Sequence, residues 1–290
     1  MKLQYDTLVC ELQPALGGCI AGLWWGDVAV LQSTPAAQLQ SVRQSASYPL
    51  VPYSNRMAQA MLHWQGQQYR LFKNWTPHPH SIHGVGWERA WSVLAQTPHS
   101  ALLGYQHAPD ASWPFAFDAT QSFTLSPQGL AMTMSITNRA DHAVPAGLGW
   151  HPFFVKRPGS HVSFTAQARW EMGPDQLPTQ RVANTGLHTN VTDLVVDHCF
   201  DGWAGEAVLR DDQITARITS TLEHLVVYTL PQRGDIAIEP VSYANNAFHR
   251  AAQGLDDPRA LGVITLQPGE TFSCAMRITL EPTPQETPAP

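Results

Sequence analysis

Apolar and polar positions alternate with a period of two in several parts of the chain. The clearest run extends from Leu130 to Thr137, where every second side chain is Leu, Met or Ile and the others are small or polar. Such alternation predicts a half-buried β-strand. Residues Thr120 to Leu125 precede this run across Ser126 to Gly129, whose Pro and Gly favour a turn, so the two runs are predicted to form a β-hairpin.

The same succession of strand, turn and strand recurs near the C-terminus. Val263 to Leu266 leads into the turn segment Gln267 to Glu270, and apolar side chains then alternate from Phe272 to Leu280. We expect a second hairpin here. Two further strands are predicted over Ile214 to Ile218 and Leu225 to Leu230.

Apolar residues at helical spacing are rare, and only Ala36 to Arg43 forms a weak helix candidate. The pattern therefore predicts an all-β protein of antiparallel sheets, a sandwich or barrel with little helix. No Pro-rich or Gly/Ser-rich linker and no run of charge interrupts the chain, which favours a single domain over residues 1–280. Residues 281–290 are rich in proline, which cannot donate to a β-ladder, so a disordered tail is expected there.

Composition excludes some partners. Of the 290 residues only 14% are charged, against about 25% in an average soluble domain. The formal net charge is −6 and no basic run is present, so we expect no nucleic-acid partner. Gln4 and Asp6 interrupt the apolar run that a secretory signal needs, and no apolar stretch reaches the length of a membrane span. We expect a cytoplasmic protein with no membrane partner.

Cofactor motifs are also missing. Nothing in the sequence matches G-x-S-x-G, G-x-G-x-x-G or a P-loop, which disfavours a serine hydrolase and a nucleotide-binding protein. On a strand, His78 and His80 would share a face while His83 would point away, and no carboxylate or cysteine completes the set, so we expect no metal site. The four cysteines lack C-x-x-C spacing and are expected to be reduced and buried: Cys10, Cys19, Cys199 and Cys274.

Polar functional groups gather among aromatic and turn residues in four segments, which span residues 52–56, 80–84, 149–154 and 236–240. In the first, the planar fork of Arg56 can donate two hydrogen bonds to vicinal oxygens. An ordinary surface arginine or an ion-pairing arginine is the alternative.

The last two segments each carry one candidate for acid–base chemistry. His151 lies between Trp150 and Phe153, in surroundings that limit water and can shift an imidazole pKa, as a general acid requires. A structural histidine that donates to a backbone carbonyl is the alternative. Glu239 ends an apolar run just before a proline, where a buried carboxylate needs partners. It is either a catalytic group or half of a structural ion pair.

Taken together and in this order, the four segments resemble the aldose 1-epimerase, or galactose mutarotase, family. Further matching segments extend the resemblance over nearly the whole chain except the last ten or so residues; they are 14–20, 138–139, 196–200 and 238–242. The resemblance implies a galactose mutarotase-like β-supersandwich of large antiparallel sheets. It also implies an isomerase that interconverts the α and β anomers of a free aldose such as galactose or glucose, with a monosaccharide as its small-molecule substrate and no metal or organic cofactor.

The resemblance also implies roles for individual residues. A general base removes the proton of the C1 hydroxyl while a general acid protonates the ring oxygen, so the ring opens and recloses as the other anomer. Glu239 aligns with the base, His151 with the acid and His83 with a second histidine near the ring oxygen. Substrate contacts fall to the remaining matched residues, namely Arg56, Asp197, Asn55 and His80, and His80 is also an alternative to His83.

One departure and several alternatives stay open. The family commonly has His-Gly-Gly where this chain has His83-Gly84-Val85, which restricts backbone freedom at the third position. A hexose-6-phosphate 1-epimerase would need a basic cluster; none is obvious and the low charge counts against it, although four arginines could converge: Arg89, Arg157, Arg169 and Arg250. A non-catalytic sugar-binding module could use the ten tryptophans. A glycoside hydrolase is disfavoured because the acid position is a histidine. Both a monomer and a homodimer are compatible with the sequence.

Overall fold

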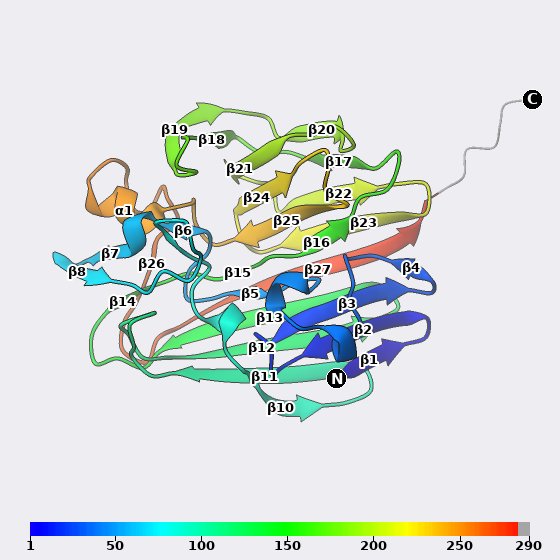
Figure 1. Cartoon of the computed structure of the whole chain (residues 1–290), viewed down its shortest axis with the longest axis horizontal. Helices are drawn as coiled ribbons and strands as arrows, with labels where there is room; N and C mark the ends of the chain where they lie inside the picture. Colours follow the sequence, from blue (N-terminus) through cyan, green and yellow to red (C-terminus); the bar gives the residue numbers. More distant parts are fainter. Residues whose placement is uncertain (284–290) are drawn as a thin grey trace, which may run out of the picture.

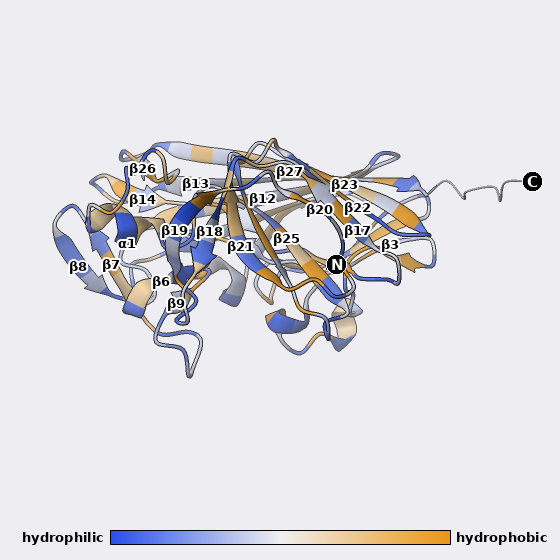
Figure 2. Ribbon diagram, turned by 90° about the horizontal axis from the view of Figure 1, so that it is seen from above, coloured by the Kyte–Doolittle hydropathy of each residue, from blue (hydrophilic) through white to orange (hydrophobic). Residues whose placement is uncertain are grey.

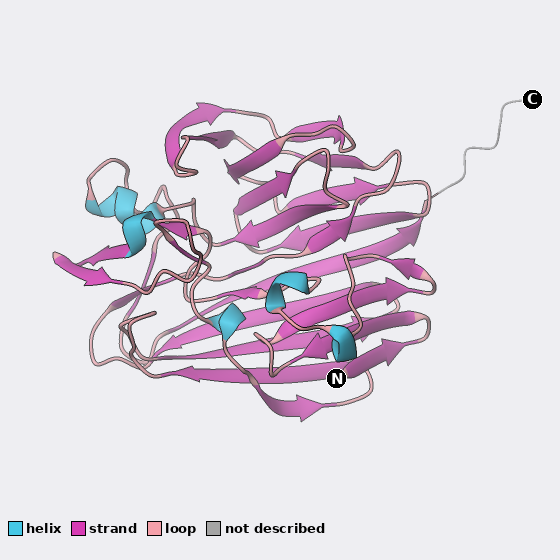
Figure 3. Cartoon of the chain, in the orientation of Figure 1, coloured by secondary structure: helices cyan, strands magenta, loops and turns pink. Residues whose placement is uncertain are grey.

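The computed structural model of the chain describes residues 1–283 and consists almost entirely of antiparallel strands (Figures 1 and 3). This confirms the all-β prediction. The largest sheet has nine strands, in the order β10 (Ser92–Gln96), β11 (Ser100–His107), β12 (Phe117–Ser126), β13 (Gly129–Asn138), β27 (Thr271–Pro282), β23 (Ile214–Ser220), β22 (Glu206–Arg210), β17 (His161–Phe164) and β20 (Leu187–Asn190).

A second large sheet has eight strands and carries the candidate base. Its order is β19 (Pro178–Ala183), β18 (Ala168–Met172), β21 (Val196–Asp201), β24 (His224–Thr229), β25 (Asp235–Val241), β15 (Gly149–Trp150) and β5 (Pro49–Leu50), with β16 (Phe153–Val155) also paired to β25. Seen from above, β13, β27 and β23 form one layer and β18 and β21 lie on the opposite side (Figure 2). Phe164 of β17 meets Phe200 of β21 edge to face, with ring centroids 4.9 Å apart, so aromatic side chains join the two sheets.

Smaller sheets complete the molecule. One has four strands, β1 (Lys2–Tyr5), β2 (Leu8–Gln13), β3 (Cys19–Trp25) and β4 (Val28–Ala29). The others are two-stranded: β14 (Val144–Ala146) with β26 (Ile264–Leu266), β6 (Arg56–Met57) with β9 (Ser81–Ile82), and β7 (Met61–Trp64) with β8 (Gln67–Arg70). The β7–β8 hairpin and the helix α1 (Ala247–Ala252) stand at one end of the molecule (Figure 1).

The structure confirms one of the two predicted hairpins and contradicts the other. β12 and β13 pair in register around the predicted turn, which confirms the first. The second is wrong, because β26 pairs with β14 while β27 pairs with β13 and β23. Both edges of β27 are thus occupied. The turn between β26 and β27 is held instead by Asn138, whose N–H donates to Glu270 and whose carbonyl accepts from Gly269.

Helix predictions were less successful. Ala36 to Arg43 contains only two short 3₁₀ turns, η1 (Ala36–Gln38) and η2 (Val42–Gln44), separated by extended backbone at Leu39. A third and a fourth 3₁₀ turn are η3 (Ala58–Ala60) and η4 (Gly86–Glu88). The α-helix α1 (Ala247–Ala252) was not predicted, because six residues are too few to show a helical period.

The C-terminal boundary lies later than expected. β27 continues to Pro282, which pairs with Ile214 on β23, so the first two residues of the predicted tail belong to the sheet. A proline fits there because β13 pairs with β27 only as far as Thr279, which leaves one edge of the strand unpaired at Pro282. The rest of the predicted tail, residues 284–290, lies outside the described residues.

The predicted state of the cysteines is confirmed, since all four are unpaired and buried. Burial raises the pKa of the Cys19 thiol to about 12. No helix in residues 1–283 is both long and apolar enough to cross a membrane.

Candidate active site

A pocket of about 370 Å³ lies on one face of the eight-stranded sheet. Its floor comes from that sheet, and its walls come from the loops around β6 and β9 and from the segment before β16. It contains every predicted site residue: Asn55, Arg56, His80, His83, His151, Asp197 and Glu239. Residues 184 positions apart in the sequence, such as Asn55 and Glu239, therefore line one cavity.

Strand register explains how the floor is built. Tyr228 on β24 lies opposite Asp197 on β21 and opposite Ala237 on β25. Directly opposed residues of antiparallel strands point to the same face, and so do residues two apart on one strand. Glu239, two positions after Ala237, therefore projects to the same face as Asp197. All seven residues of β25 are buried, so the carboxylate is presented from a fully enclosed strand.

The wall opposite the floor depends on two residues in the left-handed backbone region. Asn55 has a φ of 55° and His83 a φ of 63°. The N–H of His83 donates to the carbonyl of Asn55 at 3.0 Å, and the N–H of Asn55 donates to Nδ1 of His83 at 3.2 Å. Reciprocal bonds of this kind fix the imidazole in the wall.

The glycine that follows His83 is required by its surroundings. Gly84 has a φ of +72°, and a Cβ there would lie 2.4 Å from the carbonyl oxygen of Val51. Val85, where the family commonly has a second glycine, has an ordinary φ of −110° and donates its N–H to the same carbonyl at 3.0 Å. A β-branched residue fits this conformation without strain, so the departure from His-Gly-Gly leaves the position of His83 intact.

His151 faces Glu239 directly. Its Nε2 lies 3.2 Å from Oε1 of Glu239, and its backbone N–H donates to the carbonyl of Tyr48 at 3.0 Å. The imidazole packs between the rings of Tyr48 and Phe153, with centroid distances of 4.7 and 4.4 Å, and meets His83 edge to face at 5.2 Å. Aromatic rings thus hold the imidazole against the carboxyl group.

Burial acts on the two groups in opposite directions. It raises the pKa of Glu239 well above its usual value, with Asp197 adding to the effect and Arg56 opposing it. Burial also lowers the pKa of His151 to about 3. An ionised Glu239 with a protonated His151 is therefore not the form that this enclosed site favours. Both forms hold the same number of protons, however, so one proton transfer between the two groups interconverts them.

The second histidine is neutral and has a defined tautomer. Burial lowers the pKa of His83 well below its usual value, and the neighbouring His151 and Arg56 lower it further. Because Nδ1 accepts the N–H of Asn55, the proton of the neutral ring is on Nε2. His83 thus presents a hydrogen-bond donor.

His80 is bound on both sides of its ring. Nδ1 accepts the N–H of Gln59 at 3.0 Å, and Nε2 contacts the carbonyl of Asp175 at 3.1 Å, so Nε2 is the donor. Both ring nitrogens of His80 therefore make hydrogen bonds with backbone groups. His78 and His80 also lie in the connection between β8 and β9 and not on a strand, which corrects the geometry assumed for them. Within residues 1–283, no group of three or more metal-ligating side chains is suited to a metal ion.

Arg56 lies in the wall of the pocket and Asp197 in its floor, and the two side chains carry opposite charges. Arg56 donates to Oε1 of Gln176 at 2.6 Å and makes no ion pair within 4.0 Å among the described residues, so its interpretation as a structural ion pair is wrong. Burial raises the pKa of Asp197, while the positive charge of Arg56 lowers it. The two side chains offer a donor fork and an acceptor to a ligand with hydroxyl groups.

Sequence reasoning missed several lining residues, among them Arg43, Tyr48, Trp75, Gln176 and Arg233. Arg233 donates twice to Oδ1 of Asp235, and the guanidinium of Arg43 lies 4.0 Å from the ring centroid of Trp75. Neither arginine stands in a recognisable motif. The alternation of charge and aromatics around residues 43–48 and 228–235 is too common to mark a site.

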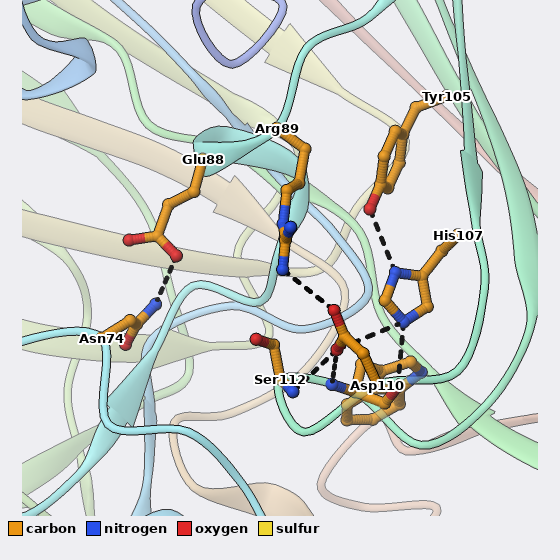
Figure 4. A network of polar contacts seen from close by, with 8 residues as sticks. Asn74, Glu88, Arg89, Tyr105, His107, Asp110 and Ser112 are labelled. Carbon is orange, nitrogen blue, oxygen red and sulfur yellow. Dashed lines mark hydrogen bonds and ion pairs between the residues drawn. The ribbon is translucent and has the colours of Figure 1, made fainter.

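The four arginines considered for a basic cluster do not converge on the pocket. Each pairs with an acid elsewhere: Arg89 with Asp110, Arg157 with Asp211, Arg169 with Glu171 and Arg250 with Asp256. Figure 4 shows the first of these pairs beside His107 and Tyr105. The basic residues that do line the pocket are Arg43, Arg56 and Arg233.

The loop that carries Trp75 is fastened by one side chain. Oδ1 of Asn74 accepts the N–H of Ile82 at 2.9 Å, and Nδ2 donates to the Ile82 carbonyl at 2.8 Å. The same amide nitrogen reaches Glu88 at 3.3 Å (Figure 4). Asn74 thereby ties the loop to β9, the strand that precedes His83.

Solved structures share this fold along almost the whole chain. A galactose mutarotase-like protein from Clostridium acetobutylicum aligns with a TM-score of 0.84 and 18% identity, covering 97% of this chain and 95% of the other. A proposed aldose 1-epimerase from Escherichia coli K12 aligns with a TM-score of 0.86 and 24% identity, covering 97% and 98%. The fold is therefore that of the galactose mutarotase-like proteins.

The family model described as Aldose 1-epimerase matches residues 13–279, so this chain belongs to the aldose 1-epimerase family. Among curated relatives, the uncharacterized E. coli K12 protein YphB is 27% identical over 91% of this chain and 93% of its own length. The uncharacterized protein YihR of the same organism is 26% identical over 69% of this chain and 70% of its own.

Proposed function

We propose that the protein is an aldose 1-epimerase that interconverts the α and β anomers of a free aldose. The observation that carries the proposal is the contact of 3.2 Å between His151 and Glu239 inside a buried pocket. Ring opening needs a base at the C1 hydroxyl and an acid at the ring oxygen, and these two oxygens are bonded to the same carbon, C1. A histidine and a carboxyl group that face each other at this separation meet that requirement.

The protonation of the pair supports these roles. Transfer of the proton from Glu239 to His151 produces a carboxylate and an imidazolium without exchange with solvent. Glu239 then accepts the proton of the C1 hydroxyl while His151 protonates O5; the C1–O5 bond breaks and leaves the open-chain aldehyde. Rotation about C1–C2 and the reverse transfers close the ring as the other anomer. The proton count of the protein is unchanged at the end.

His83 is the better candidate for the second histidine at the ring oxygen. Its ring centroid is 5.2 Å from that of His151, and its Nε2–H makes no hydrogen bond to the described residues. Both ring nitrogens of His80 already make hydrogen bonds to backbone groups. We therefore assign His83 to hold O5 as a neutral donor and His80 to shape the wall, with Arg56, Asn55 and Asp197 orienting the sugar hydroxyls.

Polarimetry tests the function. Freshly dissolved α-glucose and α-galactose should reach their equilibrium rotation faster with the protein than without it, in proportion to protein concentration. Sugar binding without faster anomer exchange would instead identify a non-catalytic binding module. A crystal soaked with galactose should show O1 and O5 at the His151–Glu239 pair.

A further inference from the structure

The three arginines of the pocket differ in how their charge is satisfied. Arg233 is 2.6 Å from Oδ1 of Asp235, a buried carboxylate. Arg56 faces the negative charge of Asp197 and donates to Gln176. Each of these two guanidinium groups thus has a protein acceptor or a neighbouring carboxylate.

Arg43 is less well satisfied. Its one hydrogen bond runs from Nη2 to the carbonyl of Asn74 at 3.3 Å, and it makes no ion pair within 4.0 Å among residues 1–283. Burial raises the pKa of Glu88 and the positive charge of Arg43 lowers it, so this carboxylate is in the neighbourhood, but it accepts from Nδ2 of Asn74 and not from the guanidinium (Figure 4). Most of the five N–H donors of Arg43 are therefore unused by the protein.

The guanidinium is nevertheless held in place. It lies over the indole of Trp75 at 4.0 Å and near that of Trp87 at 5.3 Å. Stacking uses the face of the guanidinium and leaves the N–H groups in its plane free. Arg43 is exposed and also lines the pocket, so these donors stand at the rim, where ligand and solvent meet.

A further polar group on the same wall lacks a protein partner. The side chain of Tyr48 is buried and lines the pocket, and its hydroxyl makes no hydrogen bond to the described residues. Burial raises the pKa of Tyr48 well above its usual value; the charge of Glu239 adds to the rise, and those of Arg43 and Arg233 oppose it. The Tyr48 hydroxyl is therefore near the charges of all three groups.

From this arrangement we infer that the pocket prefers an aldose that carries an oxyanion substituent, held by the N–H fork of Arg43. This inference rests on the proposed function and names its substrate class. A planar fork with free parallel donors is suited to two oxygens of a phosphate, sulfonate or carboxylate, whereas neutral hydroxyls gain less from it. The substituent is on a carbon other than C1, because in the proposed reaction C1 and O5 lie against His151 and Glu239.

The low overall charge of the chain does not oppose this preference. A net charge of −6 describes the whole surface, whereas the pocket has three arginines against Asp197 and Glu239. Asp235 neutralises Arg233, so Arg43 and Arg56 face Asp197 and Glu239, and burial favours the neutral form of Glu239. Local charge decides which ligand the rim attracts.

The test compares glucose 6-phosphate and glucuronic acid with glucose in the wild type and in Arg43→Gln. We expect kcat/KM of the wild type to be roughly tenfold or more higher for at least one anionic aldose, and Arg43→Gln to remove that advantage. Arg43→Lys, which keeps the charge but loses the fork, should retain part of it. Arg217→Gln, which removes an exposed arginine paired with Glu206 on another sheet, is the matched control and should keep the wild-type ratio.

Binding measured by calorimetry separates this inference from the proposed function. Tighter binding of an anionic aldose that depends on Arg43 and weakens with salt supports the inference even if no sugar is turned over. Equal kcat/KM for glucose and both anionic aldoses, or equal losses for all three in Arg43→Gln, would overturn it while leaving the epimerase function in place. Melting temperatures of the variants confirm that each is folded.

Discussion

The backbone N–H of Asn55 donates to Nδ1 of His83 at 3.2 Å, and this bond decides which nitrogen of the second histidine carries its proton. We expect His83→Asn to lower kcat roughly 100-fold, because it removes the donor that we assign to the ring oxygen. His80→Asn should lower kcat less, since His80 bonds only to the backbone. Initial polarimetric rates compare the two variants. A larger loss of kcat in His80→Asn would assign the ring-oxygen role to His80.

Glu239→Gln should abolish nearly all anomer exchange, a loss on the order of 10²–10⁴-fold for a general base. The fold should survive, because burial raises the pKa of Glu239. A raised carboxyl pKa means that the stability contributed by the group is complete below its unfolded value and is lost as pH rises through the folded value. At pH 8 the neutral amide should therefore melt at the same temperature as the wild type or higher. Near-normal rates in this variant would remove Glu239 from the mechanism.

His151→Asn should lower kcat strongly with little change in melting temperature at pH 7.5. Burial lowers the pKa of His151 from 6.5 to about 3, so its contribution to stability is complete above about 6.5 and is lost as pH falls toward 3. Between pH 7.5 and 4.5 the wild type should lose about 1–3 kcal/mol more than the variant. Urea unfolding at the two pH values measures the difference. A collapsed melting temperature at pH 7.5 would instead identify a structural histidine.

Gly84→Ala should displace the histidine wall. A Cβ at Gly84 would lie 2.4 Å from the carbonyl oxygen of Val51, whereas Gly254, with a similar φ of +66°, has nothing within 4 Å. Gly254→Ala therefore measures the cost of the backbone conformation alone, about 1 kcal/mol. We expect Gly84→Ala to cost about 1–3 kcal/mol more and to lower kcat, with Gly254→Ala fully active. Equal unfolding free energies would show that the contact at Val51 relaxes freely.

Local patterns predicted the parts of this protein that depend on neighbours in sequence. The β12–β13 hairpin could be predicted because its turn and both strands are contiguous. The partners of β27 could not, because β13 and β23 lie far away in the chain and no periodicity records which strand occupies which edge. Pairing of distant strands is decided by packing of the whole sheet.

Some residues of the candidate site could likewise be predicted from the sequence, and others could not. His151 and Glu239 stand in recognisable segments, and the structure places them in contact. Arg43 could not be predicted from the sequence as a site residue. What distinguishes it is that no acid forms an ion pair with it in the described part of the chain. The absence of a partner becomes visible only when the surroundings of a side chain are known.

The burial of β25 has a consequence for the motions of the pocket. All seven residues of the strand are enclosed, with β24 on one edge and β15 and β16 on the other. Amide hydrogens in such a strand exchange with solvent only when the whole molecule opens, whereas surface loops open locally at little cost. The backbone of Glu239 should thus be among the slowest to exchange deuterium, and the loop with Trp75 among the fastest. Entry and release of a ligand would then proceed by movement of the rim, while Glu239 stays fixed.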